Sequence, residues 1–279
     1  MVTNSQGAGP KSRNKIGILA RSANANLQRA WRNPFEARSA QPLITHWSHH
    51  KAGTVWFIKV LGGVSDHFSM RIALFDKEED RWERLRDLDV VVFLQTRRND
   101  PKAIGHLAFR GTHIVRDPRD MLVSAYFYHL RTDEAWVHKP REKWKGQSYQ
   151  GLLKSLSRTD GLFTELERMN RLTFKDMRTW DYTISEILEL RYEDVLADEH
   201  RMMERIFRHY GFSDSAVDYA VDTALRFSLN SRDTKRDPHV RSGRPGQWKD
   251  VLEAEHILRF KELTGDLLVR LGYEHSSDW

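Results

Sequence analysis

Arg116 and Ser124 lie on either side of a junction where a strand-like segment becomes a helix-like segment. The β-branched run 112–115 leads into an Arg-Asp-Pro turn, and apolar residues at helical spacing follow over residues 120–130. A buried strand that turns directly into a helix brings backbone N–H groups and the positive end of the helix to one point. A guanidinium and a hydroxyl aimed at that point would form an anion site, and phosphate is the expected anion.

A second junction of this kind lies upstream, at His50-Lys51-Ala52-Gly53-Thr54. Glycine allows the backbone to approach an anion closely, lysine supplies positive charge, and threonine places a hydroxyl at the start of the helix. The ATP-binding P-loop carries its lysine after the second of two glycines, whereas the lysine here precedes a single glycine. The sequence therefore predicts a phosphate cradle that lacks the spacing of a Walker NTPase.

Together with two later segments, these junctions resemble the sulfotransferases that use 3′-phosphoadenosine 5′-phosphosulfate (PAPS). The similar segments, in chain order, are His50-Lys-Ala-Gly-Thr-Val-Trp56, Arg116-Asp-Pro-Arg-Asp with Ser124, Tyr192-Glu-Asp, and Arg241-Ser-Gly-Arg-Pro-Gly-Gln-Trp-Lys249. They span most of the chain, and the Arg116 and Arg241 segments are the more specific ones. The resemblance implies the family's fold, a single α/β domain with a central parallel β-sheet flanked by helices, similar to the P-loop NTPases.

The resemblance also implies that PAPS is the sulfuryl donor and that no metal ion is required. The residues implied for donor binding are Lys51, Ala52, Gly53, Thr54, Val55, Trp56, Arg116, Ser124, Tyr192, Phe227, Arg241, Ser242 and Gly243. Arg116, Ser124 and Arg241 would hold the 3′-phosphate, and the Lys51 loop would hold the 5′-phosphosulfate. Lys51 would also be catalytic, because a fixed cation stabilises charge that develops on the leaving oxygen.

Aromatic side chains are expected around the adenine, since their faces accept nucleobases. Trp56 and Phe227 would pack on the base, and the Tyr192 hydroxyl would reach one of its nitrogens. Two positions depart from the family pattern: Ala52 replaces a loop serine, and Ser242 replaces a lysine. We expect donor binding to survive both changes, because the backbone cradle and the arginines remain.

The general base is the clearest departure from the family. The usual base is a histidine in Lys-Thr-His-Leu-Pro, at the end of the strand before the 3′-phosphate strand. The corresponding segment here is 93–99, where Arg97 stands in place of that histidine. His50, directly before Lys51, is the first candidate for a replacement, and His106 is the second; His49 and the residues of loop 131–150 are further candidates. An acceptor that needs little deprotonation would react without a base.

These side chains need a scaffold that brings distant junctions together. The continuous apolar runs, which predict strands, are 43–47, 90–94, 112–115 and the less regular 184–190. Helical spacing is found at about 54–63, 120–130, 162–172, 199–210, 214–226 and 253–271, with Gly211 and Gly272 as C-terminal caps. Short apolar strands alternating with helices predict a parallel sheet covered on both faces, with ligands at the carboxyl ends of the strands. Residues 131–150 are expected to form a long loop.

The charge of the chain is concentrated at its start. The formal net charge is +6, but seven of the 45 basic residues and only one of the 39 acidic residues lie in residues 1–40. Residues 41–279, the predicted sulfotransferase domain, are therefore electrically balanced, which disfavours nucleic-acid binding as the main role. Residues 1–40 are interpreted as a basic tail with a first helix near 16–31, or as an organelle transit peptide.

The remaining composition excludes several classes of site. Cysteine is absent, so disulfides and a cysteine nucleophile are excluded. No apolar run is long enough to span a membrane, and we expect a cytoplasmic location. The predicted activity is sulfuryl transfer from PAPS to a hydroxyl or amine of a small-molecule, glycan or lipid acceptor. The alternatives are a non-catalytic module that binds adenosine bisphosphate and a nucleotide or nucleoside kinase.

Overall fold

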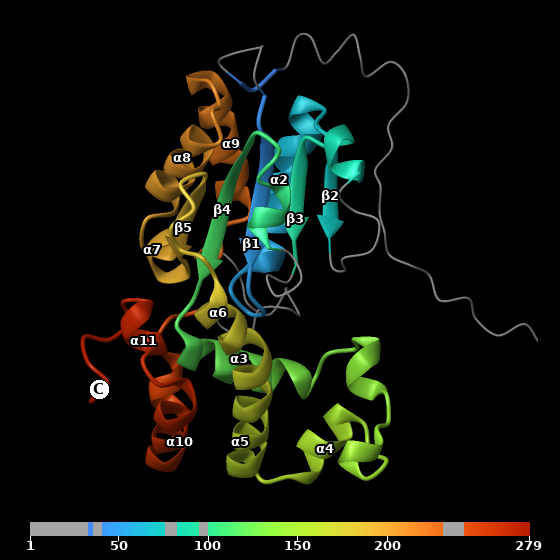
Figure 1. The fold of residues 1–279 in the computed structure, drawn as a ribbon, viewed down its shortest axis with the longest axis vertical. Helices are drawn as coiled ribbons and strands as arrows, with labels where there is room; N and C mark the ends of the chain where they lie inside the picture. Colours follow the sequence, from blue (N-terminus) through green and yellow to red (C-terminus); the bar gives the residue numbers. More distant parts are fainter. Residues whose placement is uncertain (1–32, 36–40, 76–82, 95–99, 231–242) are drawn as a thin grey trace, which may run out of the picture.

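A five-stranded sheet forms the centre of the protein, seen here in a computed structural model that describes residues 33–35, 41–75, 83–94, 100–230 and 243–279 (Figure 1). The strands are β1 (Leu43–Ser48), β2 (Ile72–Phe75), β3 (Val90–Phe93), β4 (Phe109–Val115) and β5 (Ile187–Arg191). All neighbouring strands pair in parallel, in the order β2-β3-β1-β4-β5. The predicted parallel sheet is confirmed.

The edge strand β2 was not predicted, and the run at 184–190 begins to pair only at Ile187. All four residues of β2 are apolar, as in the equally short β3, so the sequence did contain this signal; only Phe75 of β2 is buried. The central strand β1, by contrast, is buried over its whole length, and its apolar run is correspondingly easy to recognise.

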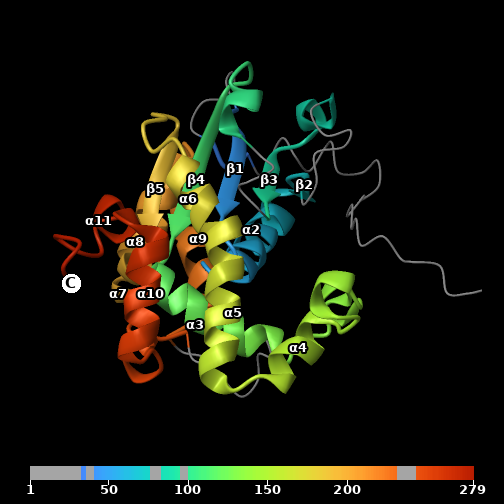
Figure 2. The same ribbon diagram turned by 60° about the horizontal axis from the view of Figure 1, so that its bottom comes forward.

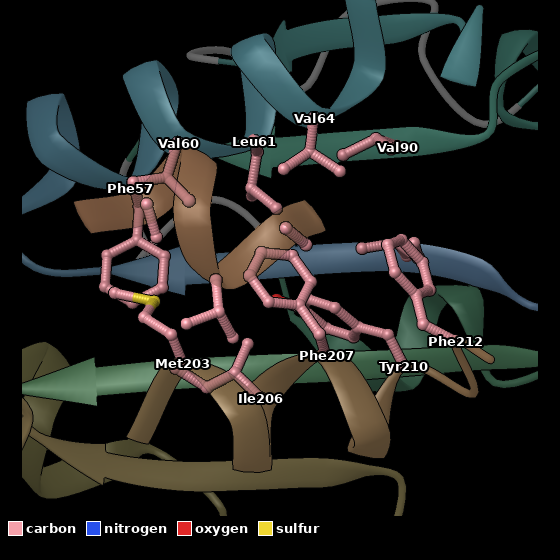
Figure 3. Close-up of a cluster of buried hydrophobic side chains, with 14 of the residues drawn as sticks. Phe57, Val60, Leu61, Val64, Val90, Met203, Ile206, Phe207, Tyr210 and Phe212 are labelled. Carbon is pink, nitrogen blue, oxygen red and sulfur yellow. The ribbon is translucent and has the colours of Figure 1, made fainter. Parts of the chain in front are cut away.

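One face of the sheet is covered by three long helices, which are α2 (Thr54–Phe68), α8 (Glu199–His209) and α9 (Asp214–Arg226). Figure 3 shows side chains of α2 and α8 meeting over this face, among them Phe57, Val60, Met203 and Phe207. The apolar positions of both helices recur at helical spacing, so each helix presents one stripe to the sheet. The short helix α7 (Tyr192–Ala197) follows β5 directly.

The opposite face is covered mainly by short helical turns and aromatic rings. The turns are η1 (Glu83–Asp87) and η3 (Pro101–Ile104). Trp47 of β1 stacks on Phe93 of β3 with ring centroids 4.9 Å apart, and Trp180 packs beside it. Flat aromatic side chains thus fill the space that a long helix would otherwise occupy.

A second group of helices lies beyond the carboxyl ends of the strands (Figures 1 and 2). Its members are α3 (Pro118–His129), α4 (Tyr149–Ser155), α5 (Arg158–Met169), α6 (Lys175–Thr179), α10 (Ala254–Thr264) and α11 (Leu267–Arg270), with one π-helical turn, η6 (Asn170–Phe174), joining α5 to α6. They share a separate apolar core that includes Met121, Leu166 and Phe260. This layer covers the edge of the sheet at which ligands of such folds bind.

Local sequence explains where α3 starts and how the predicted loop at 131–150 is organised. Asp117 caps α3 by accepting the Arg119 N–H at 2.9 Å, and Pro118 occupies the first helical position, so α3 begins earlier than the expected 120. The expected loop contains two helical turns, η4 (Ala135–His138) and η5 (Glu142–Trp144), and runs into α4.

Most of the predicted tail, with its expected helix at 16–31, lies outside the described residues. Within the part of the chain that the structure describes, no helix is long and apolar enough to cross a membrane.

Candidate active site

The Lys51 loop is the tight connection between β1 and α2. Gly53 caps α2 with a φ of 98°, and Lys51 also has a left-handed φ of 70°. Glycine adopts this conformation without the steric penalty that a side chain brings. The hydroxyls of Ser48 and Thr54 lie 2.6 Å apart across the loop, so both ends of the turn are held together. The resulting concave backbone has the shape expected of an anion cradle.

Arg116, at the end of β4, joins three segments that are distant in sequence. It is only 4% exposed, and its guanidinium donates to the backbone carbonyls of Lys51 and Arg244, each at 3.3 Å. The guanidinium also lies over the ring of Tyr192, 4.6 Å from its centroid. Its Nε–H is buried and has no hydrogen-bond partner among the described residues. The predicted Arg116, Lys51 and Tyr192 therefore come together at the carboxyl edge of the sheet.

The last family-like segment also reaches this edge, as far as it is described. The Gly243 carbonyl accepts a hydrogen bond from the Tyr192 hydroxyl at 3.0 Å. The Asp120 carboxylate accepts the backbone N–H groups of Gly246 at 2.6 Å and Trp248 at 2.9 Å. Burial raises the pKa of Asp120, although Arg116 opposes the shift. Asp120 therefore fastens the late loop to α3.

The neighbouring Arg241 and Ser242, together with Arg97, lie outside the described residues.

Of the remaining predicted donor-binding residues, Ala52, Val55, Trp56 and Phe227 lie on or beside α2, whereas Ser124 lies on α3. Ala52 is fully buried, Val55 is 39% exposed, and Trp56 packs into the main core with its Nε1 unpartnered among the described residues. Phe227, at the end of α9, lies against Gly63, two helical turns further along α2 than Trp56. Ser124 is half-buried on α3, four residues after Asp120 and hence on the same helix face.

Glu193 is a site residue that the sequence analysis missed. Its carboxylate accepts the Asp117 backbone N–H at 3.0 Å and the Tyr273 hydroxyl at 2.7 Å. The side chain therefore braces the turn that follows Arg116. The Tyr-Glu-Asp segment contained this signal, but the sequence alone did not show that its glutamate points back to the neighbouring strand.

Lys51 carries a perturbed charge. Its ammonium lies 3.8 Å from the centroid of the Tyr128 ring, and the Tyr128 hydroxyl donates to Glu134 at 2.7 Å. Burial lowers the pKa of Lys51 to about 8, and the positive charge of Arg116 adds to this shift. The protonated form of Lys51 is thus only weakly favoured over the neutral form at pH 7. A buried cation of this kind can stabilise negative charge that develops close to it.

The two histidines named as replacement bases lie at opposite edges of the sheet. His50 stacks on His129, with ring centroids 5.1 Å apart and an interplanar angle of 4°. Burial, reinforced by the positive charges of Lys51 and Arg168, lowers the pKa of His50, so the ring is neutral. His106 is exposed and precedes β4, whose seven residues span about 20 Å. The structure therefore does not bring His106 to the site, because the base would have to lie at the carboxyl edge.

His129 itself belongs to a buried network that the sequence analysis did not identify. Its Nδ1 lies 2.8 Å from the Glu165 carboxylate, which also accepts the Tyr149 hydroxyl at 2.7 Å and Arg168 at 3.3 Å. Leu122 and His129 lie seven residues apart on the buried face of α3. A histidine at an apolar position of a helix was therefore the sequence signal that could have indicated a buried polar network.

A second carboxylate–histidine pair lies within the sheet. His113 of β4 contacts the Glu189 carboxylate at 2.6 Å through Nδ1 and His49 at 2.9 Å through Nε2. The Trp180 indole N–H donates to the other oxygen of Glu189 at 2.8 Å. Burial raises the pKa of Glu189 to about 8 and lowers that of His113 to about 3, so both groups are largely neutral at pH 7.

Comparisons with known proteins agree with this architecture. The chain is similar in structure to a mouse sulfotransferase complexed with PAP, at 19% identity and a TM-score of 0.57, over 86% of this chain and 89% of that one. A retinol dehydratase in complex with androsterone and the inactive cofactor PAP is a more distant match, at 16% identity and a TM-score of 0.46, over 85% of this chain and 83% of the other. No curated protein sequence matches the chain. The family model for the sulfotransferase domain matches residues 32–272, and because that match covers most of its length, the chain belongs to the sulfotransferase family.

Proposed function

We propose that the protein transfers the sulfuryl group of PAPS to a hydroxyl or amine of an acceptor molecule. The observation that carries this proposal is the position of Arg116, whose buried guanidinium joins the Lys51 loop to the late loop. Its unpartnered Nε–H suits a phosphate oxygen, which an arginine binds through several N–H groups at once. Family membership supports sulfuryl transfer, and the mouse sulfotransferase that shares this fold is complexed with PAP.

The donor would lie across the carboxyl edge of β1 and β4. Arg116 and Ser124 would bind the 3′-phosphate. Arg241 and Ser242, which lie outside the described residues, would complete this part of the site. The backbone from Lys51 to Val55 would bind the 5′-phosphosulfate. Glycine at position 53 keeps this cradle open, because a Cβ there would lie 3.4 Å from the Tyr192 ring.

The aromatic residues would support the adenosine in different ways. The Tyr192 hydroxyl already donates to the Gly243 carbonyl, so this residue fixes the late loop, and its ring would support the donor. Trp56 is buried in the core and would support the base from behind, whereas the half-buried Phe227 is the more accessible aromatic surface.

The chemistry requires a cation at the leaving oxygen and a proton acceptor at the attacking group. Lys51 would stabilise the charge on the leaving phosphate oxygen, a type of interaction that contributes about 10²–10³-fold in rate. The sulfuryl group moves while the acceptor loses its proton, so a base must lie within hydrogen-bond reach of the acceptor. The histidines beside Lys51 are the candidates, and His50 is the one that the sequence alone indicates.

Binding experiments test the donor site first. We expect Arg116→Ala to weaken binding of adenosine 3′,5′-bisphosphate (PAP) much more than binding of adenosine 5′-monophosphate, as measured by calorimetry. Arg110→Ala is the matched control, because Arg110 is exposed near the opposite end of the same strand. Equal losses for the two nucleotides would remove the 3′-phosphate assignment. Arg116→Lys and a melting curve show whether any loss reflects misfolding.

Turnover experiments separate the enzyme from its alternatives. Release of PAP from labelled PAPS, with transfer of label to any of a broad panel of acceptors, would support the proposed activity. Lys51→Ala should reduce turnover more than it weakens PAP binding. Tight PAP binding without release of PAP on any acceptor would favour a non-catalytic module, and turnover that requires ATP and Mg²⁺ would indicate a kinase.

A further inference from the structure

Glu165 is a fully buried carboxylate that keeps its charge. Both side chains of the Glu165–His129 pair are 0% exposed. Burial alone would raise the pKa of Glu165, but His129, Arg168 and Tyr149 together hold it below its usual value. A buried carboxylate is stable only when such donors surround it, so the three contacts define one charged centre within the helical layer.

The charge of Glu165 determines the tautomer of His129. An ionised carboxylate can only accept hydrogen bonds, so the His129 Nδ1, at 2.8 Å, must carry the proton. In the neutral imidazole the lone pair is then left on Nε2, which is buried and has no hydrogen-bond partner among the described residues. Leaving such an atom unpaired costs about 1–3 kcal/mol, so this acceptor calls for a hydrogen-bond donor that the described residues do not supply.

His129 also lies directly beside the proposed reacting centre. The preceding residue, Tyr128, carries the ring over which the Lys51 ammonium sits at 3.8 Å. His50, the residue before Lys51, stacks flat against the His129 ring. The His129 ring is therefore linked to the Lys51 loop through both of these neighbours.

The two stacked histidines, His50 and His129, differ in whether a carboxylate contacts the ring. A catalytic histidine needs a third group that fixes its tautomer and stabilises the imidazolium. Glu165 does this for His129, whereas no hydrogen bond to the His50 ring is found among the described residues, and its Nε2 is also unpartnered. Lys51 and Arg168 further oppose a positive charge on His50.

We propose that the Nε2 of His129 accepts the proton of the acceptor group, with Glu165 as the positioning residue. This inference rests on the proposed sulfuryl transfer. In that step the acceptor O–H bond breaks and its proton moves to Nε2. A bond forms from the acceptor oxygen to sulfur, and the bond from sulfur to the 5′-phosphate oxygen breaks. Glu165 balances the resulting imidazolium, and Lys51 balances the charge on the phosphate.

Nitrogen NMR tests the structural part without any turnover. In protein labelled with ¹⁵N-histidine, we expect the His129 signals, assigned by their loss in His129→Asn, to show a protonated Nδ1 and an unprotonated Nε2. Glu165→Gln should change this pattern, and the surface variant His200→Asn should not. A proton found on Nε2 in the wild-type protein would overturn the proposal, because that atom could not then accept another.

Kinetics test the catalytic part, with water as the acceptor so that no natural acceptor is needed. We expect His129→Asn to slow the release of PAP from PAPS by about 100-fold or more, since general bases contribute about 10²–10⁴-fold. Glu165→Gln should slow it by about tenfold and His200→Asn by less than threefold. The pH profile of PAP release should change shape in His129→Asn, which a purely structural role would not cause.

The two proposals fail in different ways. PAP affinity within about twofold of wild type shows that the donor site of each variant is intact. Normal PAP release in His129→Asn, or a larger loss in His50→Asn, would overturn the role of His129 while leaving sulfuryl transfer in place. A wild-type protein that binds no PAP would instead contradict the proposed function, and the NMR experiment would still decide the tautomer of His129.

Discussion

The Glu165–His129 pair and the Glu189–His113 pair both contact histidines that precede Lys51, yet their carboxylates differ in charge. The more deeply buried one, Glu165, stays ionised, because burial is outweighed by His129, Arg168 and Tyr149. Glu189 is 30% exposed, but burial raises its pKa to about 8 and the Trp180 N–H offsets only part of the shift.

The difference shows that the donors around a buried acid, more than its depth, decide its charge. Glu165 lies among helices, where an arginine and a phenol reach it from α5 and α4. Glu189 lies on a strand, where its partners are a neutral indole and a histidine with a strongly lowered pKa. Only the first pair can orient a base by a fixed negative charge.

The largest effect is expected from removing each carboxylate. Glu165→Ala leaves His129, Tyr149 and Arg168 buried without their shared partner and should destabilise the protein by about 3–5 kcal/mol. Glu189→Ala removes a largely neutral group and should cost about 1–3 kcal/mol. Urea unfolding measures both, and equal losses would show that the two carboxyl groups do not differ in charge.

Amide substitutions should give pH dependences of opposite sign. The pKa of Glu165 is lowered by folding, so its charge stabilises the protein above about pH 4.5, and Glu165→Gln should be most destabilising there, by about 1–3 kcal/mol. The pKa of Glu189 rises from 4.5 to about 8, so the wild-type protein loses stability as the pH rises through that window. Glu189→Gln should therefore gain stability relative to wild type between about pH 5 and pH 8. Parallel pH profiles for the two variants would contradict the comparison.

Lys51 extends the comparison to a cation that burial destabilises. Its pKa of about 8 means that the proton is present below pH 8 and is lost above it. Turnover should fall above pH 8 by up to about tenfold per pH unit, which corresponds to about 1.4 kcal/mol. Lys51→Arg should remove this alkaline limb, because guanidinium keeps its proton. An unchanged limb in that variant would assign it to another group.

The smallest effect is expected at Arg168, which contacts Glu165 at 3.3 Å and lies over the Trp136 ring. Arg168→Met keeps much of the apolar stem but removes one of the donors of Glu165. We expect a loss of about 1 kcal/mol and an upward shift in the pKa of Glu165, visible as an acid limb of stability that moves to higher pH. A pKa of Glu165 that stays the same would show that His129 and Tyr149 keep the carboxylate charged without Arg168.

Prediction from sequence worked best where the chemistry is local. The two strand-to-helix junctions at Lys51 and Arg116 each lie within a few residues, so strand, turn, cap and charge can be read together. The central strands were recognisable because burial on both faces demands continuous apolar runs. The helical turns in the segment 131–150 lacked such runs and were missed, and the edge strand β2 was missed although its four residues are all apolar.

The candidate base shows where that reasoning stops. The sequence pointed to His50 and His106 because one adjoins Lys51 and the other follows the expected strand. Chain proximity does not specify which edge of a sheet a residue reaches, and β4 carries His106 to the far edge.

The sequence by itself determined the family, the parallel sheet and the junctions that form an anion site, because these follow from short patterns of apolar, glycine and basic residues. Only the tertiary structure decided which charges persist. His129 and Glu165 are 36 residues apart and meet only because α3 packs against α5. Whether a buried carboxylate is ionised depends on every donor around it, and two donors of Glu165, His129 and Tyr149, come from other helices that only folding brings to α5.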